Sequence, residues 1–155
     1  MELFVISVAV VLIVSALCSL TEAALYAVAP AYVRQLAESG TTQGRLLARF
    51  KANIGLPITA ILIANTVANT AGASVAGAQA RFLFGESALL WFSALFTIAV
   101  LVFSEVIPKI VGVSRNRAVA RLMAVPLDGL VRALWPVVRF TERFSSALGG
   151  AQEPV

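Results

Sequence analysis

The sequence contains no histidine and only one cysteine, Cys18. Without histidine the chain lacks the usual zinc ligand and the usual general base. A single cysteine supplies neither a disulfide framework nor a thiolate cluster, and we interpret Cys18 as a small core residue. Charged residues are also scarce, at 13% of the chain against roughly one quarter in an average globular domain. These absences argue against a soft-metal site and against histidine-based catalysis.

Long uncharged stretches take the place of these missing residues. Residues 3–21, 54–80 and 87–104 contain no charged side chain, and 59% of the chain is hydrophobic. At about 1.5 Å per residue, even the shortest stretch is about 27 Å long as a helix, close to the ~30 Å hydrocarbon thickness of a bilayer. The sequence therefore predicts an all-α membrane protein with three transmembrane helices, at about residues 3–28, 54–80 and 87–113. A signal peptide is the alternative for the first, but a basic flank is missing.

The basic residues are unevenly distributed along the chain. Apart from Arg81, they lie within residues 34–51 or from Lys109 onward. By the positive-inside rule these segments are cytoplasmic and the linker at residues 81–86 is outside, with the N-terminus outside and the C-terminus in the cytoplasm. We expect a bacterial-type inner (plasma) membrane, with the lipid bilayer and its anionic headgroups as partner and no nucleic acid.

The segments outside the three spans are amphipathic. Residues 31–52 are predicted to form a juxtamembrane connector on the cytoplasmic interface, split into two pieces by Gly40 and Gly44. Residues 114–148 are predicted to form a cytoplasmic belt of short helices broken at Pro126 and Pro136, because a fourth span would bring several arginines into the bilayer. Residues 149–155 are expected to be a disordered tail.

The third predicted span ends in Ser104-Glu105-Val-Ile-Pro108-Lys109. An acid inside the bilayer costs about 2.5–3.5 kcal/mol on insertion scales, so Glu105 is a candidate functional residue. Pro108 cannot donate to the carbonyl four residues back, which predicts a free Ser104 carbonyl beside the carboxylate.

The first two spans also carry polar side chains at helical spacing. Ser15 and Ser19 share a face with Glu22, and for Ser15 we favour a bond to its own helix or a close-packing role. Asn65 and Asn69 point the same way from the second span, beside a ridge of small residues that lets another helix approach closely. The two amides either clamp helices together or offer carbonyl oxygens to an ion.

The candidate residues of the three predicted spans lie at similar depths in the membrane. Measured from the predicted cytoplasmic edges, Ser19, Asn65 and Glu105 each lie about 12–16 Å inside the membrane. A carboxylate, amide oxygens, a hydroxyl and a backbone carbonyl are hard ligands, which suit Mg²⁺, Ca²⁺ or Na⁺ rather than Zn²⁺ or Cu⁺. If the three faces converge, they form one cation site.

Three stretches resemble motifs of the CorC/CNNM (cyclin M) magnesium transporter family. Ser19-Leu-Thr-Glu22-Ala-Ala-Leu-Tyr resembles its serine motif, Ile63-Ala-Asn65-Thr-Val-Ala-Asn69-Thr its paired-asparagine helix, and Ser104-Glu105-Val-Ile-Pro108-Lys109 its acidic-proline motif. The resemblance covers residues 1–145, which we interpret as one transmembrane transport domain.

The resemblance implies a homodimer that exports Mg²⁺ in a sodium-dependent way by alternating access, with Na⁺ as the coupling ion. It implies Ser19, Asn65, Asn69 and Glu105 as Mg²⁺ ligands, with Ser15, Thr21, Glu22, Ser104 and Pro108 as possible accessory residues. Glu22 could instead cap or pair near the interface. Members of the family usually continue into a pair of CBS modules and a CorC-type domain, which are absent from this sequence, so we expect a truncated transport domain.

Two other functions stay open at this stage. A non-transporting membrane scaffold or ion sensor would use the same polar residues as helix clamps, and a divalent cation channel would conduct without coupling to Na⁺. An enzyme is not expected, because only Ser19 with Glu22 could act as nucleophile and base and both have simpler roles.

Overall fold

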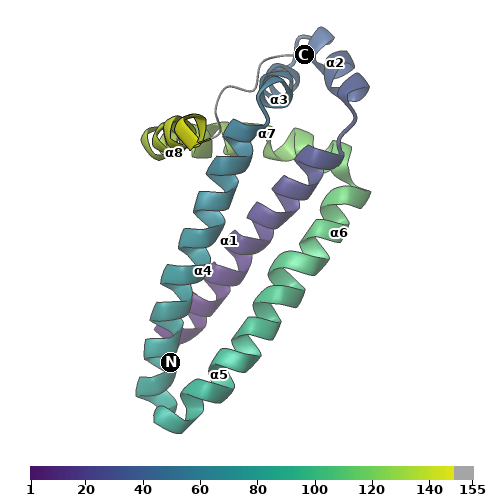
Figure 1. Ribbon diagram of the computed structural model, residues 1–155. Helices are drawn as coiled ribbons and strands as arrows, with labels where there is room; N and C mark the ends of the chain where they lie inside the picture. The colour runs from purple at the N-terminus through teal and green to yellow at the C-terminus, as the bar shows by residue number, and fades with distance from the viewer. Residues whose placement is uncertain (149–155) are drawn as a thin grey trace.

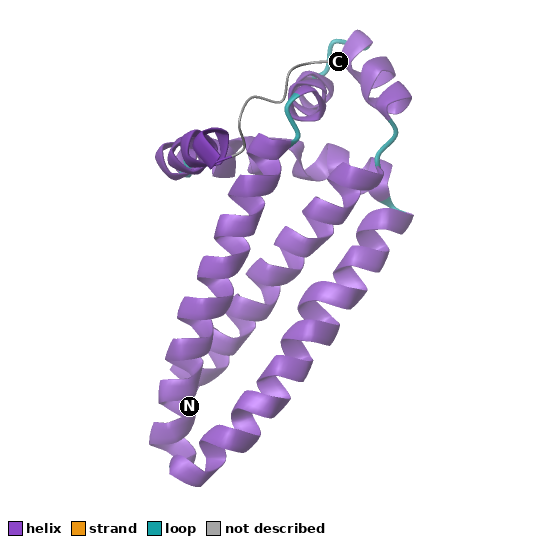
Figure 2. Cartoon of the chain, in the orientation of Figure 1, coloured by secondary structure: helices purple, strands orange, loops and turns teal. Residues whose placement is uncertain are grey.

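The computed structural model describes residues 1–148, and every regular element in that part of the chain is a helix (Figure 2). The predicted all-α membrane fold is confirmed, because three of its helical stretches are long and apolar enough to cross a bilayer. Residues 149–155, predicted as a disordered tail, lie outside the described residues.

The three membrane-length stretches form a trunk, in which two are single helices, α1 (Glu2–Ala27) and α4 (Gly55–Phe84). The third is a continuous run of α5 (Glu86–Ala99), the π-helix η1 (Val100–Val106) and α6 (Ile107–Ser114). α1 packs against α4 on one side and against η1 and α6 on the other, whereas α4 and η1 make few direct contacts (Figure 1). α1 is therefore the helix that joins α4 to η1 and α6, whereas α5 packs directly on α4 next to the turn.

Glycines set how closely α1 approaches its neighbours. A Cβ at Gly72 of α4 would lie 1.9 Å from Val11 Cγ2, and a Cβ at Gly112 of α6 would lie 2.5 Å from the carbonyl oxygen of Leu20. Both glycines are thus contact points where any side chain would force the helices apart. The predicted small-residue ridge of α4 does face α1 here, with Ala76 and Ala80 buried on the same side.

The turn between the second and third spans is shorter than the sequence suggested. We expected a linker at residues 81–86, but α4 continues to Phe84 and only Gly85 separates it from α5. Gly85 has φ +86°, a conformation that glycine adopts without steric cost. Arg81 and Glu86 form an exposed ion pair across this turn.

Four shorter helices gather at the opposite end of the trunk, which we call the arginine-rich end (Figure 1). They are α2 (Pro30–Glu38), α3 (Thr42–Ala52), α7 (Asn116–Ala133) and α8 (Trp135–Leu148). A hydrophobic core made of Leu25, Leu47, Phe50, Ala124 and Val131, among others, packs α3 and α7 onto the ends of the trunk helices.

The connector does form two pieces, α2 and α3, but Gly44 takes no part in the break between them, and the predicted break at Pro126 is wrong. Gly44 lies inside α3 rather than ending a helix, and its missing side chain lets α3 approach α2, because a Cβ there would lie 2.2 Å from the Leu36 carbonyl oxygen. Pro126 lies inside α7, which continues to Ala133. The breaks that do occur are at Gly40, where φ is +75°, and just before Pro136.

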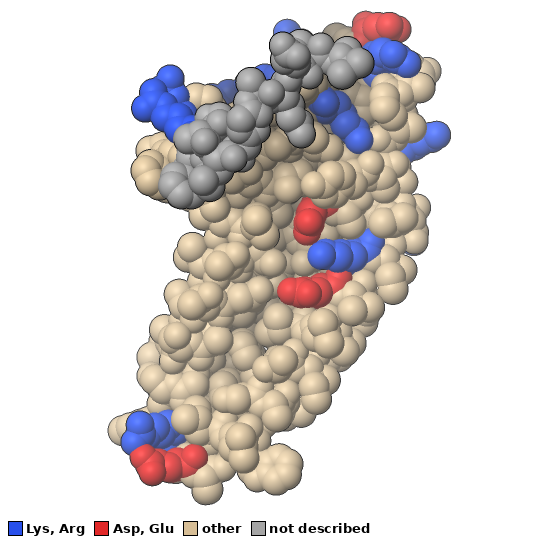
Figure 3. Space-filling model, viewed as in Figure 1, with Lys and Arg blue, Asp and Glu red and all other residues tan. Residues whose placement is uncertain are grey.

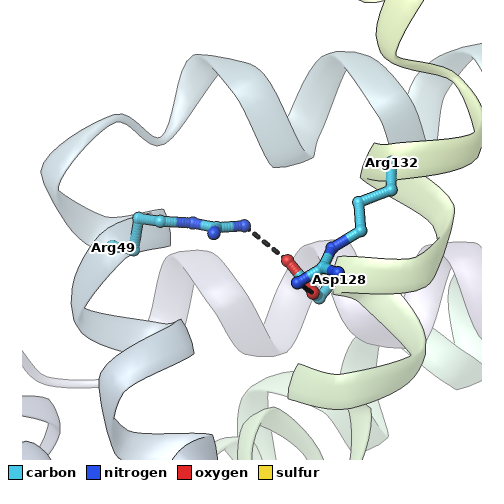
Figure 4. Close-up of polar contacts among 3 residues, drawn as sticks. All are labelled: Arg49, Asp128 and Arg132. Carbon is cyan, nitrogen blue, oxygen red and sulfur yellow. Dashed lines mark hydrogen bonds and ion pairs between the residues drawn. The ribbon is translucent and has the colours of Figure 1, made fainter.

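An ion-pair cluster fixes α7 against α3. The carboxylate of Asp128, with its side chain only 10% exposed, binds Arg49 of α3 through one oxygen and Arg132 of α7 through the other, the latter at 2.7 Å (Figure 4). A nearly buried carboxylate needs such partners, since desolvation of an isolated charge is costly. The cluster therefore fixes the positions of α3 and α7 relative to each other.

Candidate functional site

Glu105 lies in the π-helical segment of the third span. The Ile107 N–H donates to the carbonyl of Val102, five residues back, instead of four as in an α-helix. In a π-helix the N–H of residue 108 would donate to the carbonyl of Phe103, five residues back, but proline has no N–H. The carbonyl that loses its donor in this register is therefore that of Phe103, whereas an α-helical register predicts Ser104. Single-turn π segments inside α-helices frequently occur at functional sites.

Ser104 connects this segment to α1 through its side chain. The fully buried Ser104 hydroxyl donates to the carbonyl oxygen of Leu12 at 3.0 Å. Because Glu105 is the next residue, this contact gives its axial level, which is that of residues 12 and 13 of α1. Glu105 itself is half-buried.

The asparagine pair of α4 forms a short hydrogen-bond chain with α1. Ser15 Oγ donates to Asn65 Oδ1 at 2.7 Å, and Asn69 Nδ2 donates to the same oxygen at 3.4 Å. The sequence favours for Ser15 either a bond to its own helix or a close-packing role. The bond to its own helix is wrong, because the Ser15 hydroxyl bonds across to α4, whereas Ser15 is fully buried as close packing requires.

The Asn69 side chain leaves one atom without a partner. Its amide nitrogen faces Asn65, and its Oδ1 is buried with no hydrogen-bond donor, the only such side-chain atom among the described residues. A buried carbonyl oxygen without a donor costs about 1–3 kcal/mol, so Asn69 Oδ1 is available to an electropositive group such as a cation.

Contacts with α1 also give the axial register of the other helices. Gly72 lies opposite Val11 and Asn65 opposite Ser15, so Asn69 falls between these two levels. Glu105 falls in the same interval, because Ser104 binds Leu12. Asn65, Asn69 and Glu105 therefore lie at one depth, within about one helical turn.

Ser19 is placed differently from this group. It is buried, but one turn beyond Ser15, which is about 6 Å farther toward the arginine-rich end. Because α1 and α4 are antiparallel, the part of α4 at the level of Ser19 lies before Asn65 in the sequence, on the side away from Asn69. The serine at the level of the amides is Ser15.

Two other polar residues of the serine motif have structural partners. Thr21 Oγ1 donates to the Leu17 carbonyl of its own helix at 2.6 Å. Glu22 lies 3.6 Å from Lys109 Nζ of α6, which agrees with pairing near the interface. Figure 3 shows a small group of acidic and basic side chains part-way along the trunk and a second group at its far end, where Arg81 and Glu86 flank the Gly85 turn. Glu22, Glu105 and Lys109 are the charged residues of α1, η1 and α6 beyond Glu2.

The structure does not join Glu105 to the asparagine pair. Among the described residues no hydrogen bond or ion pair involves the Glu105 carboxylate, and α1 separates η1 from α4. No group of three His, Cys, Asp or Glu side chains gathers in the described part of the chain either. Any cation held here would depend on one carboxylate together with neutral oxygens.

Two features of this region had no assigned role in the sequence analysis. Lys109 was noted only as part of the motif, although its position four residues after Glu105 and near Glu22 could have suggested a charge partner. In the sequence only Pro108 hinted at an irregular helix, and nothing indicated a π-helix. The wider turns of the π-helix depend on how the third span packs on α1.

Comparison with known families decides the identity of the chain. The model of the cyclin M transmembrane N-terminal domain matches residues 5–154. The chain belongs to the cyclin M family. Its three polar motifs therefore lie within a domain shared by that family.

Relatives of this cyclin M domain are found in bacteria and plants. The UPF0053 protein sll1254 of Synechocystis is 31% identical over 142 residues, 92% of this chain and 41% of the relative. The chloroplastic DUF21 domain-containing protein At1g55930 of Arabidopsis thaliana is 31% identical over 140 residues, 90% of this chain and 21% of the relative. A UPF0053 protein of Haemophilus influenzae is 26% identical over 146 residues, 94% of this chain and 34% of the relative. The chain spans less than half the length of each.

Proposed function

We propose that this cyclin M domain exports Mg²⁺ across a membrane in exchange for Na⁺ by alternating access. The proposed ligands of the transported ion are Asn65, Asn69 and Glu105, which lie at one depth, and Ser19, which lies one turn farther along α1 and would reach the ion only when α1 shifts along α4. The single observation that carries the proposal is the buried Asn69 Oδ1, which has no donor and lies at the depth of Glu105. A neutral oxygen aimed at no donor is a ready cation ligand, and hard oxygen ligands suit Mg²⁺.

The separation between Glu105 and the amides fits a transport cycle. In the proposed cycle the third span moves relative to α1, so that the carboxylate meets the ion held by Asn65 and Asn69 in one state and withdraws from it in the other. The π-helix and Pro108 make the third span easier to bend near Glu105, because both disrupt the regular backbone hydrogen bonds of the helix there. One carboxylate against a divalent cation leaves a positive site that can release its ion.

The proposed orientation follows from the basic residues. The arginine-rich end, with α2, α3, α7 and α8, would face the cytoplasm, and the Gly85 turn and the N-terminus would face outside. A bacterial-type inner (plasma) membrane, a homodimer, and CBS and CorC-type domains in the longer protein complete the proposal.

Transport by the chain in proteoliposomes tests the function. We expect Mg²⁺ efflux driven by a Na⁺ gradient, abolished by Glu105→Gln. Glu86→Gln is the matched control, because it removes an equivalent charge from an exposed pair at the far end of the trunk and should leave flux unchanged. Full flux in a well-folded Glu105→Gln variant would exclude the site, and flux that ignores the Na⁺ gradient would indicate a channel.

Thermal unfolding separates transport from the second candidate function, a scaffold in which the asparagines only clamp helices. The Ser15 and Asn69 bonds to Asn65 favour such a clamp. At Mg²⁺ a hundredfold above its Kd, binding adds about 2.7 kcal/mol to the stability of a binding-competent chain. We expect Asn69→Ala to lose this Mg²⁺-dependent gain without losing stability in the absence of Mg²⁺, because the substitution removes a buried oxygen that has no donor and breaks only the 3.4 Å contact with Asn65. A scaffold predicts no Mg²⁺-dependent gain in either protein.

A further inference from the structure

A second polar site lies at the arginine-rich end, away from the intramembrane residues. It is an open pocket of about 590 Å³ between α2, α3 and α7, lined by Tyr32, Gln43, Arg117, Ala118, Arg121 and Leu122. Arg117 and Arg121 are four residues apart, so their guanidinium groups lie on the same face of α7. Two like charges at this spacing repel one another unless an anion lies between them.

The charges of these two arginines are not neutralised within the described side chains. No acidic residue there forms an ion pair with Arg117 or Arg121, whereas Arg49 and Arg132 share Asp128. The Arg117 guanidinium lies 5.2 Å from the centre of the Tyr32 ring, which orients it through a cation–π contact. The pocket therefore presents two positive groups, one of them held in place, to an external anion.

The position of the pocket indicates which kind of molecule carries that anion. Tyr32 follows the end of α1 by five residues and Arg117 follows the end of α6 by three, so the pocket lies where two spans leave the membrane. Leu122, which lines the same pocket, has 74% of its surface exposed, and Val125 on the next position of that face is also exposed. Positive groups beside exposed aliphatic side chains match a ligand with a phosphate head and acyl chains.

We propose that this pocket binds the headgroup of an anionic glycerophospholipid. The two guanidinium groups hold the phosphate, a geometry to which arginine is suited, and the Gln43 amide lies in reach of the headgroup glycerol. The first part of the acyl chains lies over Leu122. A bound lipid would tie α2 to α7 at the level of the membrane surface, independently of any ion transported by the trunk.

Native mass spectrometry of the purified, delipidated chain tests this proposal. Phosphatidylglycerol and phosphatidylcholine with the same acyl chains are the probes, and we expect the wild type to retain phosphatidylglycerol selectively. Arg117→Gln and Arg121→Gln should each weaken that retention about fivefold. Arg45→Gln is the matched control, because Arg45 is an exposed arginine of α3 outside the pocket and carries the same charge.

Three results would overturn the proposal. An equal loss in Arg45→Gln and the pocket variants would mean diffuse attraction to the surface. Binding of glycerol phosphate as tight as that of phosphatidylglycerol would mean a soluble phosphate ligand, and equal retention of both lipids by the wild type would mean no anionic site. Arg121→Gln provides the cleanest variant, since Arg121 makes no ring contact with the described side chains. Thermal unfolding in detergent checks that this variant folds.

Discussion

Ser15 Oγ donates to Asn65 Oδ1 at 2.7 Å, linking the first two membrane-length helices between residues that are fifty positions apart. The same oxygen accepts the weaker bond from Asn69, so Asn65 closes the contact between α1 and α4 while Asn69 keeps a free carbonyl oxygen. The two asparagines therefore differ in role, although they look equivalent in the sequence. In the arrangement described here Asn65 joins the two helices, and Asn69 has the oxygen that is free to meet an ion.

The Ser15–Asn65 bond should contribute measurably to stability. Interhelical hydrogen bonds in a membrane average about 0.6 kcal/mol and reach about 1.7 kcal/mol. We expect a coupling energy in this range from a double-mutant cycle of Ser15→Ala and Asn65→Ala, measured by unfolding in detergent. Ser7→Ala is the control, because Ser7 bonds only to the Phe4 carbonyl of its own helix. Additive single effects would show that the bond does not form.

The contact at Gly112 should not tolerate a side chain. A Cβ there would lie 2.5 Å from the Leu20 carbonyl oxygen and 3.0 Å from Ala23 Cβ, so Gly112→Ala must push α6 away from α1. Overpacking of this kind costs typically about 1–3 kcal/mol. Gly129→Ala, in the interior of α7 with no neighbouring atom within 4 Å, should instead stabilise the chain by about 0.5–1 kcal/mol. Comparing the two melting temperatures checks the packing, and a neutral Gly112→Ala would contradict it.

The ion-pair cluster at Asp128 should matter more than the pair at the Gly85 turn. Asp128→Asn leaves Arg49 and Arg132 without their carboxylate, and we expect a loss of about 1 kcal/mol, since the arginines are largely exposed and water screens them. Glu86→Gln breaks the exposed Arg81 pair, for which 0–1 kcal/mol is typical. Urea unfolding at low and high salt measures both. Equal effects of the two substitutions would mean that the burial of Asp128 adds nothing.

Much of the fold could be predicted because its cause is local. Uncharged stretches of membrane length predict the three spans whatever their neighbours are, and the amphipathic segments follow from the spacing of their arginines. The errors concern residues whose effect depends on a neighbour. Gly44 and Pro126 are helix breakers in isolation, but Gly44 lies against α2 and Pro126 is carried within a helix packed on the core.

The candidate site divides in the same way. The sequence alone determined which residues carry oxygen ligands, which helix each belongs to and which face each occupies, because helical periodicity fixes the face. Only the tertiary structure decided the axial register: that Ser15 rather than Ser19 meets Asn65, that Lys109 pairs with Glu22, and that α1 separates Glu105 from the amides. Hydrophobic and polar periodicity cannot predict the axial register, because a helix that slides by one turn along its neighbour still presents the same face. Here it is set by close contacts at Gly72 and Gly112, whose partners lie far away in the chain.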